Sequence, residues 1–182
     1  IGEATTRLLA SFGVDALISS RKIEQLERVA GDVTREFGRK VVPLAGDVRD
    51  EDSCKAMIDR TIAEFGRIDS CFVNAGVGGQ APSFVGMSED EWHRVLRVNL
   101  DGAFFTAQEA VKQMVAQDPQ GGSAVFTTSG SAKYGQQRGQ HYGGSKGAVI
   151  SMMKGIAVEH ARHGIRCNAI LPGWIESDMT AG

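Results

Sequence analysis

The chain has 182 residues, of which 42% are hydrophobic and 23% are charged, and its formal net charge is −2. This length and balance are typical of one sizeable globular domain, and they exclude the basic composition of a nucleic-acid-binding protein. The three cysteines are widely spaced and form no C-x-x-C pair, so we predict neither a disulfide framework nor a metal site. No apolar run reaches the ~18 residues that a membrane span needs, and we expect a protein of the reducing cytoplasm.

Strand-like and helix-like segments alternate along the chain, as judged from the spacing of its apolar residues. We predict helices at 3–12, 23–37, 52–65, from 88, at 102–117 and at 140–163, and strands at 14–18, 41–44, 68–73, 124–128 and 165–171. Ser88 followed by Glu91 has the pattern of a helix capping box. The alternation predicts a doubly wound parallel sheet with helices on both faces, in a single domain over residues 1–182.

Tyr142 and Lys146 are four residues apart in the long helix predicted at 140–163. This spacing places both side chains on one helix face, about 5–6 Å apart at Cβ. A lysine ammonium stabilises a nearby phenolate, so we expect a pKa of Tyr142 below its ordinary value near 10. Such a tyrosine can exchange a proton with a substrate oxygen, which a nearby serine hydroxyl can hold. Alone, the pair is more typical of a half-buried tyrosine packed on a lysine stem.

Three further motifs occur with this pair in one chain. The run Asn74–Gly76 follows a predicted strand, Asn99 precedes a predicted helix, and Pro172–Gly173 follows the last predicted strand. With these residues in view, the chain resembles the classical short-chain dehydrogenase/reductase family from Gly2 to about Met179. The resemblance implies a Rossmann-like fold.

The resemblance also implies an oxidoreductase that transfers a hydride between a nicotinamide cofactor and a small-molecule carbonyl or secondary alcohol. It assigns acid–base catalysis to Tyr142 and contact with the substrate oxygen to Ser129. Lys146 would tune Tyr142 and bind the nicotinamide ribose, and Asn99 would hold a water that links Lys146 to solvent. Two alternatives stay open, because Ser131 lies close to Ser129 and because Asn99 is also a candidate cap of the following helix.

A cofactor site follows from the same resemblance. The residues expected to contact the cofactor are Gly2, Ser20, Arg21, Asp47, Val48, Asn74, Ala75, Gly76, Tyr142, Lys146, Pro172, Gly173, Ile175 and Ser177. Ser20 occupies the position where an acidic residue would select NAD, and Arg21 follows it. A guanidinium and hydroxyls suit a 2′-phosphate, so NADP(H) is favoured over NAD(H). The structural alternatives are a solvated helix-start charge for Arg21 and a helix cap for Asp47.

The family pattern further places a first strand and a glycine-rich loop before Ile1 and a substrate lid after Gly182. The additional strand would lie in the middle of the sheet, where unpaired backbone groups are costly. Family members are commonly tetramers, so we expect a homo-oligomer with the helices at 102–117 and 140–163 between subunits.

Two other interpretations of the fold remain. One is an epimerase or dehydratase with a tightly held cofactor, and the other is a non-catalytic nucleotide-binding regulator or scaffold. The four histidines lack the spacing of metal ligands and are interpreted as surface or helix residues. His141 adjoins Tyr142 and is therefore a candidate for the wall of the substrate pocket.

Overall fold

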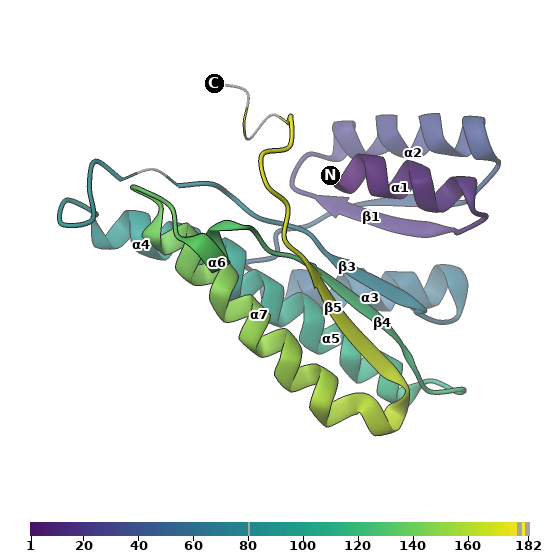
Figure 1. The fold of residues 1–182 in the computed structure, drawn as a ribbon. Coiled ribbons are helices and arrows are strands. Elements are labelled where there is room, and N and C mark those ends of the chain that lie inside the picture. The colour runs from purple at the N-terminus through teal and green to yellow at the C-terminus, as the bar shows by residue number, and fades with distance from the viewer. Residues whose placement is uncertain (80, 178–179, 181–182) are drawn as a thin grey trace.

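The computed structural model describes residues 1–79, 81–177 and 180, and its helices and strands alternate as the sequence predicts (Figure 1). The first elements are α1 (Gly2–Ser11), β1 (Ala16–Ser20), α2 (Ile23–Phe37), β2 (Val41–Ala45) and α3 (Glu51–Phe65). The later ones are β3 (Ser70–Val73), α4 (Glu89–Leu96), η1 (Arg97–Asp101), α5 (Gly102–Ala116), β4 (Gly122–Thr127), α6 (Ser131–Tyr134), α7 (Gln140–His160), η2 (Ala161–His163) and β5 (Ile165–Ile170).

Most of these elements agree with the sequence pattern, and the differences are local. The strand predicted at 14–18 lies at Ala16–Ser20, and the long helix ends at His160 with a separate 3-10 turn after it. The short helix α6 was not predicted, because four residues are too few to show a helical period. Helix α2 ends as expected at Gly38, whose φ of 65° lies in the left-handed region that glycine adopts freely.

The parallel strands form two sheets instead of one continuous sheet. β1 pairs with β2, and β3, β4 and β5 pair in that order. Strands β1 and β3 line opposite sides of a cavity of about 1530 Å³, and no strand in the described part of the chain lies between them.

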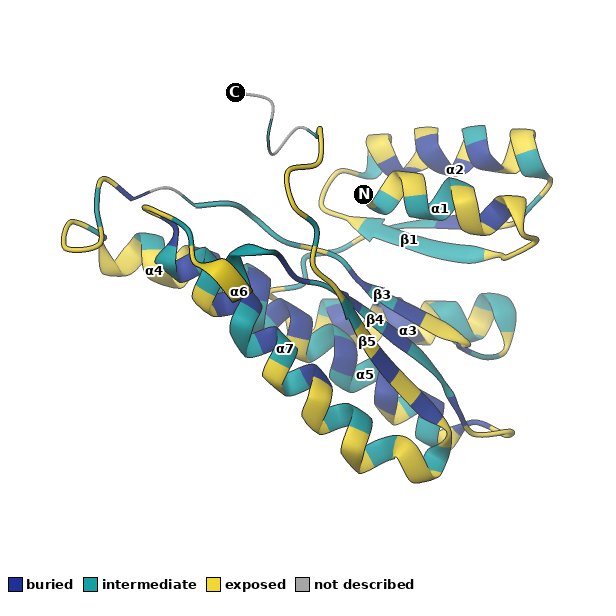
Figure 2. Cartoon of the chain, viewed as in Figure 1, coloured by how far each residue is buried: buried dark blue, intermediate teal, exposed yellow. Residues whose placement is uncertain are grey.

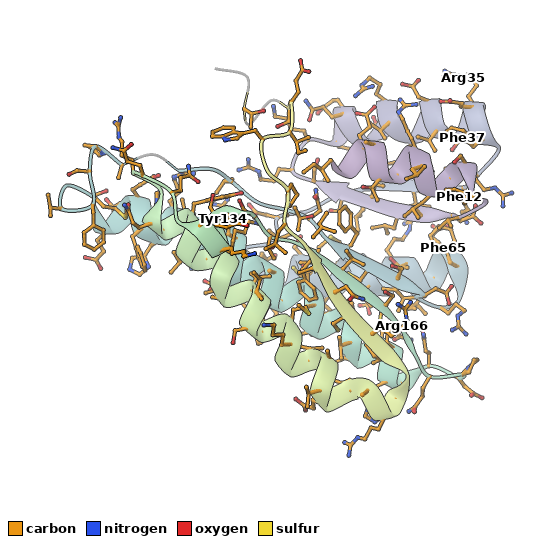
Figure 3. The ribbon with its side chains drawn as sticks, viewed as in Figure 1. Phe12, Arg35, Phe37, Phe65, Tyr134 and Arg166 are labelled. Atoms are coloured by element: carbon orange, nitrogen blue, oxygen red, sulfur yellow. The ribbon has the colours of Figure 1, made fainter. Side chains whose placement is uncertain are left out.

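Helices cover the sheets on two sides. In Figure 1, α1 and α2 lie on one side of β1, whereas α5 and α7 lie against β3–β5 on the other side of the molecule, and α3 packs on α5 and β1. The main core lies between β3–β5 and helices α5 and α7, where the buried residues of Figure 2 gather. The opposite face of β5 is open to solvent, because Arg166 (labelled in Figure 3) and Asn168 are exposed there. The predicted doubly wound parallel architecture is therefore confirmed.

Helices α4 and α5 run into one another through the π-helical turn η1. The backbone N–H of Gly102 donates to the carbonyl of Arg97, five residues back, and Asn99 is completely buried in the middle of this turn. A single π turn inside an α-helix widens the helix locally and is frequent at functional sites. Asn99 therefore lies inside a continuous helical segment, so the alternative that it caps the following helix is wrong.

Candidate active site

One cavity brings most of the predicted site residues together. It runs between β1 and β3 and along the carboxyl ends of the strands, where ligands bind in open α/β sheets. Ser129, Tyr142, Lys146 and every residue predicted to contact the cofactor line this cavity. Asn99 is the exception, because it is buried behind the cavity wall.

Lys146 reaches this cavity from the buried side of α7. It is only 4% exposed, its Nζ donates to the carbonyl of Thr127 at 2.8 Å, and it lies 5.9 Å from the centre of the Tyr142 ring. Burial lowers the pKa of Lys146 from 10.5 to about 8, because a charged ammonium loses its hydration there. A Cβ on Gly76 would lie 3.2 Å from Nζ, so the absence of a side chain at Gly76 gives the ammonium its space.

The side chain of Ser129 is fixed by its neighbours at the end of β4. Its Oγ accepts a hydrogen bond from the backbone N–H of Ser131 at 3.1 Å and donates to Ser131 Oγ at 3.2 Å. Ser131 Oγ in turn donates to Gln136 at 2.8 Å. Ser129 lines the cavity, as Tyr142 and Lys146 do, whereas Ser131 does not, so the structure favours the first of the two candidate serines.

Asn99 connects the segment after β3 with the first turns of α7. Its Oδ1 accepts from the Val77 N–H at 2.7 Å, and its Nδ2 donates to the Val77 carbonyl at 3.0 Å and to Ser145 Oγ at 3.2 Å. Ser145 Oγ then donates to the Tyr142 carbonyl at 2.7 Å. Both amide hydrogens of Asn99 are therefore used, and Oδ1 keeps one further acceptor position, near Gly76.

The first turn of α1 and the end of β3 meet at the cavity. Asn74 Oδ1 accepts from Thr127 Oγ1 at 2.9 Å, which joins the ends of β3 and β4. A Cβ on Gly2 would lie 3.1 Å from Asn74 Nδ2, so the start of α1 approaches this strand end closely. The free N–H groups at a helix start favour an anion such as a phosphate.

At the end of β1 and β2, basic side chains surround one carboxylate. Ser20 Oγ accepts from the Lys22 N–H at 3.3 Å, and Arg21 is exposed. Arg49 binds Asp47 with two nitrogens, including Nη2 to Oδ2 at 2.5 Å, and this contact lowers the pKa of Asp47 to about 2. The alternative of Asp47 as a helix cap is wrong, because the side chain that caps α3 belongs to Asp50.

The segment after β5 closes the other end of the cavity. The Pro172 carbonyl accepts from the Gly130 N–H at 3.1 Å, which holds the end of β5 against the segment that follows β4. Thr180 Oγ1 donates to the Ile175 carbonyl at 2.7 Å and accepts from the Ser177 N–H at 3.0 Å. Pro172, Gly173, Ile175 and Ser177 all line the cavity. Met179, where the family resemblance ends, lies outside the described residues.

Several residues of this site were not predicted from the sequence. Thr180 lines the cavity, Arg49 holds Asp47, and Ser145 links Asn99 to Tyr142. Only Ser145 carried a local signal, since it lies three residues after Tyr142 on the same helix. His141 also differs from expectation, because it is completely buried against Glu91 and does not line the cavity.

The residues present fit a dinucleotide. The cavity has a helix start suited to phosphate, glycines whose missing Cβ atoms leave room for close approach, and a basic end beside Arg21 and Arg49. The described residues contain no group of three or more side chains placed to hold a metal ion. They also contain no helix of the length and apolarity needed to cross a membrane. Fold and cavity together define a Rossmann-like dinucleotide-binding domain.

Comparison with known proteins identifies the family. The short chain dehydrogenase family model matches residues 1–182. The chain is 37% identical to the 3-oxoacyl-[acyl-carrier-protein] reductase FabG of Thermotoga maritima, over 99% of this chain and 72% of that protein. It is 33% identical to the L-rhamnose 1-dehydrogenase (NAD(P)(+)) of a Sphingomonas species, over 98% of this chain and 70% of that protein.

A solved structure agrees with these relatives. A short-chain type dehydrogenase/reductase from Mycobacterium marinum superposes with a TM-score of 0.93 at 32% identity, over 99% of this chain and 70% of that one. The chain therefore belongs to the short-chain dehydrogenase family, as the sequence motifs predicted, and it is an NAD(P)-dependent dehydrogenase/reductase.

Proposed function

We propose that this protein transfers a hydride between NADP(H) and a carbonyl or secondary alcohol substrate, with Tyr142 as the acid–base residue. The observation that carries the proposal is that Ser129, Tyr142 and Lys146 all line the cavity that fits the cofactor, with Lys146 Nζ 5.9 Å from the centre of the Tyr142 ring. These three residues come from the end of β4 and from α7, so their convergence is a property of the tertiary fold.

Each residue has a role that follows from its contacts. Ser129 Oγ, held by the Ser131 N–H, is available to hydrogen-bond the substrate oxygen and to stabilise charge that develops on it. Tyr142 donates or accepts the proton on that oxygen. Lys146 brings a positive charge near the tyrosine ring, and its effect on Tyr142 stays a prediction. The bound nicotinamide supplies or accepts the hydride.

Asn99 supports this set from behind the cavity wall. Oδ1 of Asn99 can accept one further hydrogen bond. A Cβ on Gly76 would lie 3.3 Å from this oxygen and 3.2 Å from Lys146 Nζ, so both atoms lie close to Gly76. A water held there would connect the ammonium with the backbone of the segment after β3. The contacts of Asn99 with Val77 and Ser145 fix the distance between that segment and α7.

The preference for NADP(H) rests on the charges at the end of β1. Arg21 follows Ser20 there, and Arg49 lies beside Asp47 in the same part of the cavity. Two guanidinium groups close to hydroxyls suit the 2′-phosphate of NADP(H). NAD(H) remains the alternative cofactor.

The experiment that tests this function is turnover of NADPH and of NADH by the intact protein with a panel of ketones, compared with a Tyr142→Phe variant. We expect carbonyl-dependent oxidation of the cofactor in the parent protein and nearly complete loss of this activity in Tyr142→Phe. The variant should bind the cofactor with the affinity of the parent protein. Cofactor binding without turnover of any carbonyl would favour the regulator interpretation. Near-normal rates in Tyr142→Phe would refute the assignment of the acid–base residue.

We also propose a cytoplasmic homo-oligomer. Phe104 on α5 and Val158 on α7 are exposed, so both helices present apolar side chains to an adjacent subunit. Cys54, Cys71 and Cys167 are all buried and free, which supports a reducing compartment. Light scattering of the intact protein tests the assembly, and a monomer in solution would refute the proposed homo-oligomer.

A further inference from the structure

A buried histidine lies directly before Tyr142. His141 is completely buried, and its Nε2 lies 3.1 Å from Glu91 Oε1 on α4. Arg94 donates to both oxygens of Glu91, at 2.6 and 2.9 Å, and also to the Gly78 carbonyl at 2.8 Å. These contacts lower the pKa of Glu91 to about 2, and the hydrogen bond from Arg94 has the largest effect. The ionised carboxylate only accepts hydrogen bonds, so His141 Nε2 is the donor.

The segment after β3 packs on this histidine–carboxylate pair. A Cβ on Gly79 would lie 2.2 Å from His141 Nε2 and 2.8 Å from Glu91 Oε1, so only glycine fits. Two residues further on, the Ala81 N–H donates to the Arg138 carbonyl at 3.0 Å, and Arg138 Nε donates back to the Ala81 carbonyl at 2.8 Å. The segment is thus attached both to α4 and to the residues that lead into α7.

The start of α7 has little local support of its own. The residue before the helix is Gly139, and no side chain caps the first turn. Gly143 and Gly144 follow Tyr142, and glycine weakens a helix because it has the largest backbone freedom to lose. The position of the first turn, and of Tyr142 in it, must therefore come from tertiary contacts, and His141 provides a buried one.

Stability alone does not account for a histidine at this position. In the described part of the chain, Nδ1 of His141 is buried and has no hydrogen-bond partner. A buried unsatisfied polar atom is costly, whereas an apolar side chain of similar size avoids that cost. A residue kept for packing would be apolar, so the polar contact with Glu91 points to a requirement for orientation.

We propose that His141 is a positioning residue, which holds Tyr142 in place against the substrate face through its hydrogen bond to the Glu91–Arg94 pair. The proposal rests on the function proposed for Tyr142. It goes beyond that function, because it makes the geometry of the acid–base residue depend on α4 and on Val77–Gly79 and Ala81. Removing the hydrogen bond should then lower kcat and leave cofactor binding unchanged.

The kinetic test compares two substitutions at one position. His141→Leu keeps the size and removes the donor, and His141→Gln returns a donor that can reach Glu91. We expect kcat to fall by roughly 10- to 100-fold in His141→Leu, since a misplacement of about 1 Å can have that effect, and to recover largely in His141→Gln. Glu91→Leu, which removes the acceptor, should resemble His141→Leu, and the two losses should not add, because both substitutions break the same contact.

A second pair on α4 provides the matched control. His93 Nε2 lies 3.5 Å from Glu89 Oε1, and both side chains are exposed. His93→Leu and Glu89→Leu should leave kcat unchanged. A lowered melting temperature with normal kcat in His141→Leu would overturn the proposal, because it would show a structural role only.

A second readout does not depend on activity. The chain has two tyrosines, and Tyr134 on α6, labelled in Figure 3, is 79% exposed. In protein labelled with fluorotyrosine, the fluorine resonance of Tyr142 should move or broaden in His141→Leu, while that of Tyr134 should not change. If His141→Leu does not fold, Glu91→Leu gives the same readouts.

The two readouts separate the possible failures. If the parent protein turns over no carbonyl, the proposed function fails, and the fluorine resonance still decides whether His141 positions Tyr142. An unchanged Tyr142 resonance in both folded variants would refute the positioning role.

Discussion

Replacing Lys146 by methionine should stabilise the cofactor-free protein while abolishing its activity. Lys146 is 4% exposed, and burial lowers its pKa from 10.5 to about 8. Since one pKa unit corresponds to about 1.36 kcal/mol, holding the charged lysine there costs about 3 kcal/mol at neutral pH. Methionine fills the same space without a charge. It also leaves the Thr127 carbonyl without its donor, which costs about 1 kcal/mol, so the net gain is about 2 kcal/mol.

The dependence on pH gives this prediction a second signature. Below pH 8 the lysine is protonated in both the folded and the unfolded state, and the full cost of burial is present. Between about 8 and 10.5 the unfolded state binds more protons than the folded one, so the stability of the parent protein rises with pH. The advantage of the methionine variant should therefore be largest at neutral pH and should disappear as the pH approaches 10.5.

Thermal unfolding of the intact protein without cofactor is the assay. For a domain of this size, a gain of about 2 kcal/mol raises the melting temperature by roughly 4–8 °C. Lys154→Met is the matched control, because Lys154 is an exposed lysine on the same helix, and it should change the melting temperature little. An equal or lower melting temperature of Lys146→Met at neutral pH would refute the reasoning, and so would a difference that does not shrink with rising pH.

Three further outcomes are expected. Arg21→Asp should shift the ratio of kcat/KM for NADPH over NADH by roughly 10- to 100-fold toward NADH, because a charged hydrogen bond to the 2′-phosphate is lost; an unchanged ratio would contradict the NADP(H) preference. Gly79→Ala should lower stability by about 1–3 kcal/mol in denaturant titrations, because its Cβ meets His141 Nε2 at 2.2 Å; parent-like stability would mean that this segment moves freely. Acid unfolding should begin below about pH 4.5, because Glu91, with its pKa lowered from 4.5 to about 2, stabilises the fold above that pH and loses its contacts as the pH falls. Glu91→Gln should flatten that acid limb, and an unaltered limb would show that other carboxylates dominate.

The sequence determined the features that depend on short spacing. Tyr142 and Lys146 lie on the same face of α7, because four residues make about one helical turn. The alternating apolar patterns predicted the parallel fold. Ser88 was correctly predicted as the cap of α4. The second half of the capping box was wrong, because the carboxylate of Glu91 binds Arg94 and His141 instead of the start of its own helix.

Other features were decided only by the tertiary structure. The π turn around Asn99, the burial of His141 and the pairing of Arg49 with Asp47 gave no periodic signal in the sequence. Asn99 and Ser145 are 46 residues apart, and Glu91 and His141 are 50 apart. Local patterns predict which face of a helix a residue occupies, but the neighbour on that face depends on how distant elements pack. The proposed catalytic set could therefore be named from the sequence, whereas the contacts that orient it required the folded chain.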